Sequence, residues 1–334
     1  MQGARSIALQ TLSFFDANGY ISFRKLDIAL STLSSQDRSF CMNIIYGCLR
    51  KRVSIDFELS RFLTKPSKLP HAVLNALRIG AFQILYMKSI PEYAALKSSV
   101  DMIVVKEFKG LVNAVLRKLI NGGPAKRKPL NILYSHPEWL VNYWREFAWI
   151  DDFEEFLEYN QTPPVQTVLS LGRENELIKN GFIFDKSEYS DLSCVFQKGS
   201  SIENLQIIDE IEYLLSKTAI PVLTHKGSLT GKINSMPWLL HTLTPEKIDG
   251  YSKVAVESLG NFSREHNEFI YYSQAFTVEE NKHALDVLKG FEPVMMEDFF
   301  AEHKISARFD GKGYWLQPWK APATCYLARV RSAN

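Results

Sequence analysis

The chain has 334 residues, of which 46% are hydrophobic, and this size predicts two or three globular domains. It contains no run of eighteen apolar residues, and its first residues lead into an amphipathic stretch, so we expect a cytoplasmic protein without a membrane span or export signal. The four cysteines are scattered without metal-ligand spacing, which argues against both a disulfide scaffold and a zinc site.

Charge is distributed unevenly along the chain. Residues 1–130 hold 20 Lys and Arg against 8 Asp and Glu, a net charge of +12, whereas the remaining 204 residues hold 19 against 29, a net charge of −10. A basic excess of this size predicts binding to a polyanion, because neutralised phosphates release their condensed counterions. The alternative is a well-solvated helical surface with no ligand.

Apolar residues recur at helical spacing from Ala4 to about Ile120, which predicts an all-helical domain of five to seven helices. Turn and start signals divide this stretch at residues 17–19, 34–37, 66–70 and 89–92. The glycines and prolines of residues 121–129 then end the last helix. We therefore predict a helical domain over residues 1–125, a linker and bridging segment over 126–200, and an α/β domain over 201–334.

The bridging segment and the last domain have mixed character. Residues 134–159 predict aromatic-rich helices, and residues 165–170 predict a strand after Pro163 and Pro164. Further strands are predicted at 220–223, 269–272 and 325–330, with a helix at 279–288. This alternation is typical of a sheet covered by helices.

Several motifs together resemble the small-subunit rRNA cytosine-C5 methyltransferases that carry a NusB-like N-terminal domain, the RsmB family. In the helical domain these are residues 36–50 (QDRSFCMNIIYGCLR) and 111–118 (LVNAVLRK), followed by residues 134–141 (YSHPEWLV) in the bridging segment. Near the end, residues 243–248 (LTPEKI) and Tyr272-Ser273 with the later Glu279-Glu280-Asn281 match further family stretches. The resemblance implies a NusB-like helical bundle followed by a truncated Rossmann-like methyltransferase domain.

The resemblance also implies two catalytic cysteines, and neither is present. Methylation at C5 of cytosine needs a thiolate that adds to C6 of the ring, and a second cysteine helps to release the product. The position of the nucleophile falls at Ala275, and the position of the second cysteine falls at Gly227. We therefore expect no catalytic residues in this chain and treat Gly227 and Ala275 as degenerate positions.

A cofactor site is not expected either. A Rossmann-like fold binds S-adenosylmethionine through a glycine-rich turn after the first strand, yet no glycine lies between Gly199 and Thr224. The first half of the methyltransferase sheet is predicted to be deleted between Leu205 and Val222, and the acidic run 209–212 to be the solvated face of a helix. If the chain is aligned with the family in another register, Gly231-Lys232 falls on the family's cofactor loop. One of the loop's paired glycines is then retained.

Three further features have structural interpretations. Residues 227–232 (GSLTGK) are similar to a phosphate-binding P-loop but are one residue short, and Ile233 replaces the magnesium-binding Ser or Thr. The Thr324-Cys325 pair is interpreted as part of a structural strand, and Phe299, Phe300, Trp315 and Trp319 as core rather than as base-stacking residues. No arrangement of histidines predicts a metal or hydrolase site.

Candidate RNA-binding residues are the cations near helix ends, where arginine forks and free backbone amides both bind phosphate. They are Arg5, Arg38, Arg50, Lys51, Arg52, Arg117, Lys118, Lys126, Arg127 and Lys128. The cluster from Arg50 to Arg52, assumed to be exposed, is the first choice. Arg38 has an alternative role in capping its helix, and Arg117 in packing.

The favoured hypothesis is an RNA-binding protein without catalysis or cofactor, acting on rRNA in ribosome assembly or in NusB-like transcription antitermination. Its predicted partners are RNA, above all rRNA, and ribosomal or transcription proteins. The alternative is an active S-adenosylmethionine-dependent rRNA cytosine-C5 methyltransferase with an atypical site.

Overall fold

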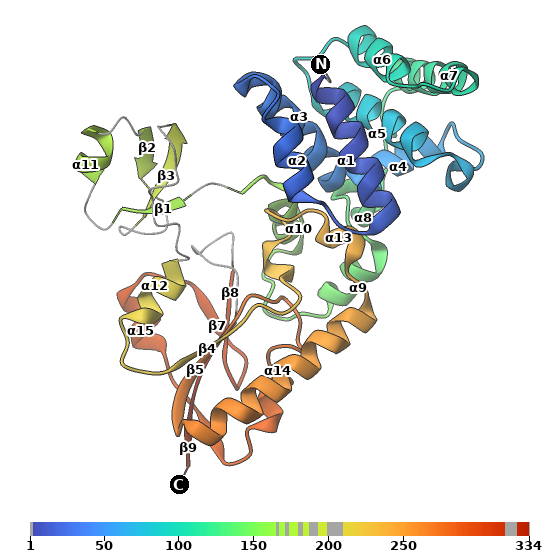
Figure 1. The fold of residues 1–334 in the computed structure, drawn as a ribbon. Coiled ribbons are helices and arrows are strands. Elements are labelled where there is room, and N and C mark those ends of the chain that lie inside the picture. The colour runs from blue at the N-terminus through green and yellow to red at the C-terminus, as the bar shows by residue number, and fades with distance from the viewer. Residues whose placement is uncertain are drawn as a thin grey trace. The chain divides into compact units, whose positions relative to one another are not determined.

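A computed structural model describes residues 3–164, 167–170, 174–179, 183–186, 193–198, 210–317 and 326–333. Contacts divide the chain into two units, the first comprising residues 1–146 with 240–242 and the second comprising residues 147–239 with 243–334 (Figure 1). Helices α8 and α9, which follow the predicted boundary at residue 125, are thus grouped with the first unit. Whether residues 1–125 fold alone remains a prediction.

The first unit is all-helical, as the sequence predicted. Its elements are α1 (Ala4–Asn18), α2 (Phe23–Leu30), α3 (Ser35–Arg50), α4 (Arg52–Ser60), the 3-10 turn η1 (Pro66–Lys68), α5 (His71–Tyr86), α6 (Glu92–Asp101), α7 (Lys106–Gly122), α8 (Leu130–Leu133), α9 (Glu138–Arg145) and most of α13 (Leu239–Thr242). Seven of these helices lie before residue 123, within the predicted range of five to seven.

The helix ends follow the predicted signals. Gly19 ends α1 in the left-handed region at φ 76°, and its amide donates to the carbonyl of Phe15. The hydroxyl of Ser34 accepts from the amide of Asp37 at the start of α3, while Pro70 and Pro91 precede α5 and α6. Local chemistry therefore sets most boundaries in this unit.

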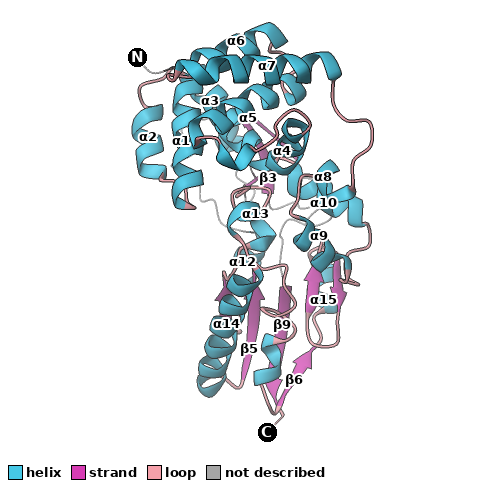
Figure 2. Cartoon of the chain, turned by 90° about the vertical axis from the view of Figure 1, so that its right-hand side faces the viewer, coloured by secondary structure: helices cyan, strands magenta, loops and turns pink. Residues whose placement is uncertain are grey.

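Helix α5 is the centre of the bundle, and residues 75–83 of it are all buried. It packs against α1 and α3 and also against the α6–α7 pair (Figure 2). A helix that is buried around its whole circumference holds any polar side chain it carries inside the protein. This arrangement explains the internal polar network described below.

The second unit begins with α10 (Phe153–Gln161) and a small antiparallel sheet in the order β1-β3-β2. The strands are β1 (Thr167–Leu169), β2 (Ile183–Lys186) and β3 (Ser193–Lys198), and helix α11 (Glu174–Lys179) lies between β1 and β2 in sequence. Strand β1 confirms the strand predicted at 165–170, of which residues 165 and 166 lie outside the described residues.

The main sheet has the order β4-β5-β9-β8-β7, with β6 also paired to β9. The strands are β4 (Val222–His225), β5 (Glu268–Ser273), β6 (Phe291–Val294), β7 (Ala307–Phe309), β8 (Tyr314–Leu316) and β9 (Tyr326–Ser332). Strands β4 and β5 are parallel, and the other pairs are antiparallel. Among the described strands β4 pairs only with β5, so it lies at one end of the described sheet.

Helices cover this sheet. The long α14 (Pro245–Glu265) contacts β4 and β5, and its Phe262 packs against Phe269 of β5. Side chains of α12 (Glu210–Ser216) and α15 (Glu297–Glu302) form a core with Ile270 and Tyr272, which alternate with Phe269 along β5 and so point to the opposite face. The predicted α/β character of this unit is confirmed.

Two local predictions need correction. Residues 279–288 do not form a helix but a turn followed by the 3-10 segment η4 (Ala284–Val287), because backbone carbonyls there bind elsewhere. The carbonyl of Glu280 accepts from the hydroxyl of Tyr271, and that of Glu279 from Ser252. The acidic run at 209–212 lies on α12 only in part: Glu212 is exposed, Glu210 is buried, and residue 209 lies outside the described residues.

Candidate functional site

The degenerate catalytic positions lie in two loops that follow parallel strands. Since β4 and β5 are parallel, their carboxyl ends meet at one edge of the sheet, where α/β proteins place their ligand sites. The amide of Gln274, after β5, donates to the carbonyl of His225 at the end of β4 (3.0 Å), and the carbonyl of Gln274 accepts from Gly231 (3.1 Å). The structure thus brings the loops of Gly227 and Ala275 together.

Glu280 is the polar centre of this region. Its fully buried carboxylate accepts hydrogen bonds from the amide of Ser228 (2.8 Å), the hydroxyls of Ser228 and Thr277 (2.6 Å each) and Nε2 of His225 (3.0 Å). Burial alone would raise the pKa of Glu280, but these hydrogen bonds outweigh it and hold the pKa below its usual value. The carboxylate is therefore an anion that ties the two loops together.

Gly227 occupies a position that favours glycine. Its φ is +46°, in the left-handed region, and an added Cβ would overlap both Oε1 of Glu280 and Nε2 of His225. A cysteine at this position would displace the hydrogen bond that joins these two side chains. The absence of a thiol at residue 227 is thus built into the packing of the loop.

Ala275 is equally enclosed. It is fully buried, its amide donates to the hydroxyl of Ser273, and its carbonyl accepts from Nδ2 of Asn281 (2.7 Å). The next residue, Phe276, packs against Trp149 with ring centroids 5.3 Å apart, and Trp149 stacks on Trp315 at 4.8 Å. Aromatic side chains therefore fill the space beside this loop.

This aromatic layer confirms one prediction. Trp315 is 2% exposed and Phe300 is 6% exposed, so both belong to the core and cannot stack on a base. Trp319 and the Thr324-Cys325 pair lie outside the described residues. Cys41, Cys48 and Cys194 are buried free thiols.

The backbone of residues 227–232 does not form a phosphate cradle. A P-loop directs its amides at a ligand, whereas here the amide of Ser228 donates to Glu280, that of Leu229 to the carbonyl of Lys226, and that of Gly231 to Gln274. The hydroxyl of Thr230 accepts from the amide of Phe276. The sequence-based rejection of a P-loop agrees with this geometry.

The first-choice basic cluster is not exposed, and this assumption was wrong. Arg50 is 6% exposed, and the side chain of Arg52 is 20% exposed and pairs with Asp16 at 2.7 Å. Lys51 is half-buried, with its ammonium over the ring of Tyr86. These side chains mainly stabilise the helical unit.

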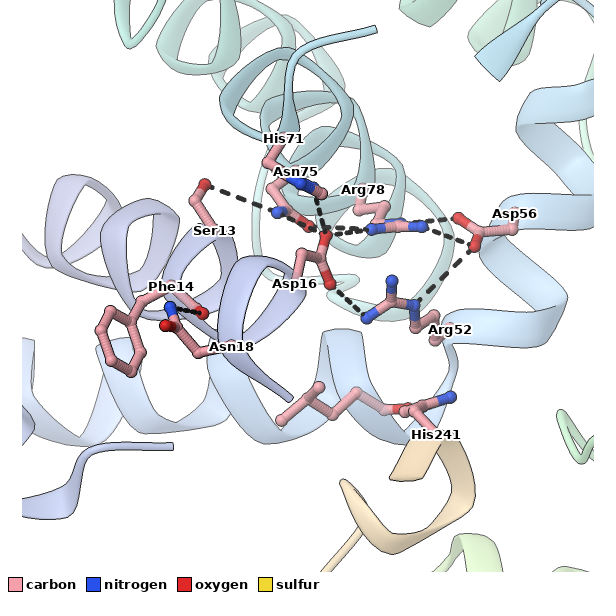
Figure 3. Close-up of polar contacts among 11 residues, drawn as sticks. Ser13, Phe14, Asp16, Asn18, Arg52, Asp56, His71, Asn75, Arg78 and His241 are labelled. Atoms are coloured by element: carbon pink, nitrogen blue, oxygen red, sulfur yellow. Dashed lines mark hydrogen bonds and ion pairs between the residues drawn. The ribbon is translucent and has the colours of Figure 1, made fainter. Parts of the chain in front are cut away.

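Arg52 belongs to a network that joins α1, α4 and α5 (Figure 3). Arg78 on α5 lies between two carboxylates and donates to Asp16 (2.8 Å) and, through two nitrogens, to Asp56 (2.7 and 2.8 Å). Burial would raise the pKa of Asp16, but the adjacent Arg52 and Arg78 guanidinium groups lower it overall. No local sequence pattern indicates this network, because Arg78 and Asp16 lie 62 residues apart.

A second buried carboxylate, Glu58 on α4, holds the segment after α7. It accepts from Nζ of Lys128 (2.6 Å), from Nη1 of Arg61 (2.5 Å) and from the amide of Ala125 (3.0 Å). Lys128 is therefore engaged inside the first unit. The linker predicted to begin at residue 126 is therefore fixed to the bundle at Lys128, as is Ala125 just before it.

The other candidate cations divide into two groups. Arg5 is half-buried, donates to Oε1 of Gln83 (2.8 Å) and lies over the ring of Phe40. The exposed group consists of Arg38, Arg117, Lys118, Lys126 and Arg127. Of the candidate RNA-binding cations, these exposed side chains remain available to bind an external phosphate.

The described part of the chain contains neither a membrane-spanning helix nor a metal-binding cluster of side chains. No helix there is both long and apolar enough to cross a membrane. Nor do three or more His, Cys, Asp or Glu side chains come together in an arrangement that could hold a metal ion.

The fold defines a class: a helical bundle followed by an α/β unit with a mixed sheet. Residues 2–121 match the NusB family. A crystal structure of PH0851 is similar in fold over 99% of both chains, with a TM-score of 0.71 and 13% sequence identity.

Two curated relatives are similar to about half of the chain or somewhat more. The chain is 32% identical over 176 residues to the probable ribosomal RNA small subunit methyltransferase B of Bacillus subtilis, which is 49% of this chain and 39% of the relative. It is 31% identical over 215 residues to the ribosomal RNA small subunit methyltransferase B of Thermus thermophilus, which is 61% of this chain and 51% of the relative. The chain thus has a NusB-family region over residues 2–121 and is similar to RsmB-type relatives, and these matches span about half or less of the relatives' length.

Proposed function

We propose that this chain is an RNA-binding protein of the RsmB type that does not methylate cytosine. The observation that carries the proposal is the absence of cysteine at Gly227, where a side chain would need a left-handed backbone and would displace His225 and Glu280. Ala275, at the other family position, supplies no nucleophile. Because C5 methylation proceeds through a covalent thiolate adduct, a chain without either thiol lacks the chemistry.

The proposal extends to the cofactor. No glycine-rich turn lies between Gly199 and Thr224, and the amides of Ser228, Leu229 and Gly231 all bind protein acceptors. These features support a protein that works without S-adenosylmethionine. The filled aromatic layer around Trp149 and Phe276 supports the same conclusion.

RNA binding is supported by charge and by family. The net charge of +12 over residues 1–130 and the exposed cations on α7 and after it form a surface suited to phosphates. The NusB-family match covers this part of the chain, and the relatives are named for the small-subunit ribosomal RNA. We infer that the target is rRNA, with ribosome assembly or antitermination as the setting and ribosomal or transcription proteins as partners.

The test of lost catalysis uses the full chain, small-subunit rRNA and radiolabelled S-adenosylmethionine. We expect no incorporation above the no-protein control, and none from Ala275→Cys, which adds a thiol without a methyl donor site. An active rRNA cytosine methyltransferase is the positive control. Labelling stoichiometric with protein, or micromolar S-adenosylmethionine binding by titration calorimetry, would support the active-enzyme alternative instead.

The RNA target is tested separately. Ultraviolet crosslinking in cells, followed by sequencing of the attached RNA, should recover small-subunit rRNA or its precursor. Recovery of unrelated nascent transcripts would favour a transcription role. A chain that crosslinks to no RNA would contradict the RNA-binding part of the proposal.

A further inference from the structure

A groove between α1 and α2 lies apart from the ion-pair networks described above. It has a volume of about 190 Å³ and is lined by Ile7, Gln10, Thr11, Phe14, Ser22, Lys25, Leu26 and Ala29. Its floor is apolar, since Ile7 and Leu26 are buried core residues, and Gln10 and Ser22 add hydrogen-bonding side chains. An apolar hollow with a few polar groups fits a small planar ligand.

An aromatic wall continues from the groove to the surface. The ring of Phe14, which lines the groove, meets that of Tyr20 edge to face at 5.4 Å. Tyr20 is 55% exposed and Phe23, at the start of α2, is 43% exposed. The exposed ring of Tyr20 beside an apolar hollow offers a π-face on which another ring can stack.

Cations accompany these rings. The ammonium of Lys25 lies 4.9 Å from the centroid of Phe14, and both Arg24 and Lys25 are exposed. Asp27 is the single acidic residue of α2. The corner therefore combines exposed aromatic rings with positive charge, the pairing by which single-stranded nucleic acids are held without duplex geometry.

We propose that this corner binds one unpaired nucleotide of RNA. The base stacks on Tyr20 and enters the groove beside Phe14, while Lys25 and Arg24 bind the adjoining phosphate. Gln10 and Ser22 are placed to hydrogen-bond the edge of the base. This inference rests on the proposed RNA-binding function and assigns it a site for single-stranded segments.

The experiment compares binding of the full chain to a fluorescein-labelled single-stranded RNA 12-mer and to a duplex of the same length. Tyr20→Ala should weaken single-strand binding about 5- to 100-fold, since each base stacked on an aromatic side chain contributes this much, and should leave duplex binding unchanged. Lys25→Ala should reduce the salt slope for the single strand by about 0.7. Tyr20→Phe keeps the ring and should bind like the wild type.

Tyr93→Ala is the matched control, because Tyr93 is 75% exposed in the same unit but lies at the start of α6. Circular dichroism establishes that each variant is folded. If the wild type binds the single strand and Tyr20→Ala and Lys25→Ala bind equally well, the corner is no RNA site and suits a protein partner instead, while the proposed function stands. If the wild type binds neither RNA, both proposals fail.

Discussion

At the scale of single residues, Gly227 combines a left-handed backbone with close contacts to two polar side chains. Gly227→Ala should destabilise the α/β unit by at least about 2 kcal/mol, because an L-residue in the left-handed region is strained and its Cβ also displaces Glu280 or His225. Urea unfolding followed by tryptophan fluorescence measures the change, since Trp149 and Trp315 are buried in this unit.

The matched control is Gly250→Ala. Gly250 lies within α14, and nothing stands within 4 Å of an added Cβ, so alanine should raise the stability by about 0.5–1 kcal/mol. If both glycine variants shifted the midpoint in the same direction, the special role of Gly227 would be refuted.

In the helical unit, we expect the replacement of Arg78 to give the largest loss in the free energy of unfolding. Arg78→Ala leaves the buried carboxylate of Asp16 with one guanidinium fewer, and breaking a buried ion pair costs about 3–5 kcal/mol. Denaturant titration by circular dichroism measures this loss. Lys253→Ala, which removes one side of an exposed pair with Asp249, should cost less than about 0.5 kcal/mol.

His136 should make stability depend on pH. Burial lowers its pKa to about 3, whereas an unfolded histidine titrates near 6.5. Below about pH 6.5 His136 is protonated in the unfolded chain but stays neutral in the folded chain. The free energy of unfolding therefore falls by about 1.4 kcal/mol per pH unit until the pH reaches the folded pKa. His241, whose pKa burial lowers to about 4, acts in the same direction.

The measurement is the free energy of unfolding at several pH values between 7.5 and 5, where most carboxylates stay ionised. His136→Phe keeps a ring for the edge-to-face contact with Trp144 and removes the titrating group, so its pH slope should be smaller. An identical slope in the two proteins would show that His136 is not the group responsible.

At the scale of elements, the segment after α7 decides where the helical unit ends. Residues 1–125 are predicted to fold alone, and we expect residues 1–146 to be clearly more stable. The longer fragment retains Lys128 on Glu58 and the hydrogen bond from the amide of Ser54 to the hydroxyl of Ser135. Thermal melts of both fragments by circular dichroism measure the difference.

Lys128→Ala in the longer fragment separates these contributions, because it removes the ion pair and keeps α8 and α9. Its midpoint should lie between those of the two fragments. Equal midpoints for residues 1–125 and 1–146 would mean that the Lys128–Glu58 ion pair, α8 and α9 add nothing to stability. A coil-like spectrum of residues 1–125 would instead place the folding boundary beyond residue 125.

At the scale of the whole molecule, affinity for RNA should fall steeply with salt. If about four to six phosphates are neutralised, log affinity should fall against log salt with a slope of about −3 to −5. The cations to replace are exposed ones, Arg117, Lys118, Lys126 and Arg127, because replacing Arg50 and Arg52 would disturb the fold. The variant with all four cations replaced by glutamine should have a slope that is less steep by about two to three units. We expect this change for all RNA sequences.

Filter binding from 50 to 300 mM salt measures both slopes. Lys253→Gln, an exposed lysine of the acidic part of the chain, should leave the slope unchanged. A fourfold variant with the wild-type slope and an intact helical spectrum would show that this surface is only solvated. The RNA-binding site would then be assigned to Arg38 or to the corner between α1 and α2.

Much of the fold could be predicted because it depends on local signals. The spacing of apolar residues, the cap at Ser34 and the left-handed end at Gly19 act within a few residues, so α1 to α7 followed from the sequence. The sequence also shows directly that residues 227 and 275 are not cysteines, while their assignment as the family's catalytic positions stays a prediction.

The tertiary structure alone decided which charges are internal. Arg52 and Arg78 meet Asp16, and Lys128 meets Glu58, across separations of 36 to 70 residues that no local pattern encodes. The helix predicted at 279–288 failed for the same reason, since contacts of Glu280 with His225 and Ser228 override local propensity. A sequence determines which side chains are charged, but burial against distant partners determines whether they bind ligands or hold the fold together.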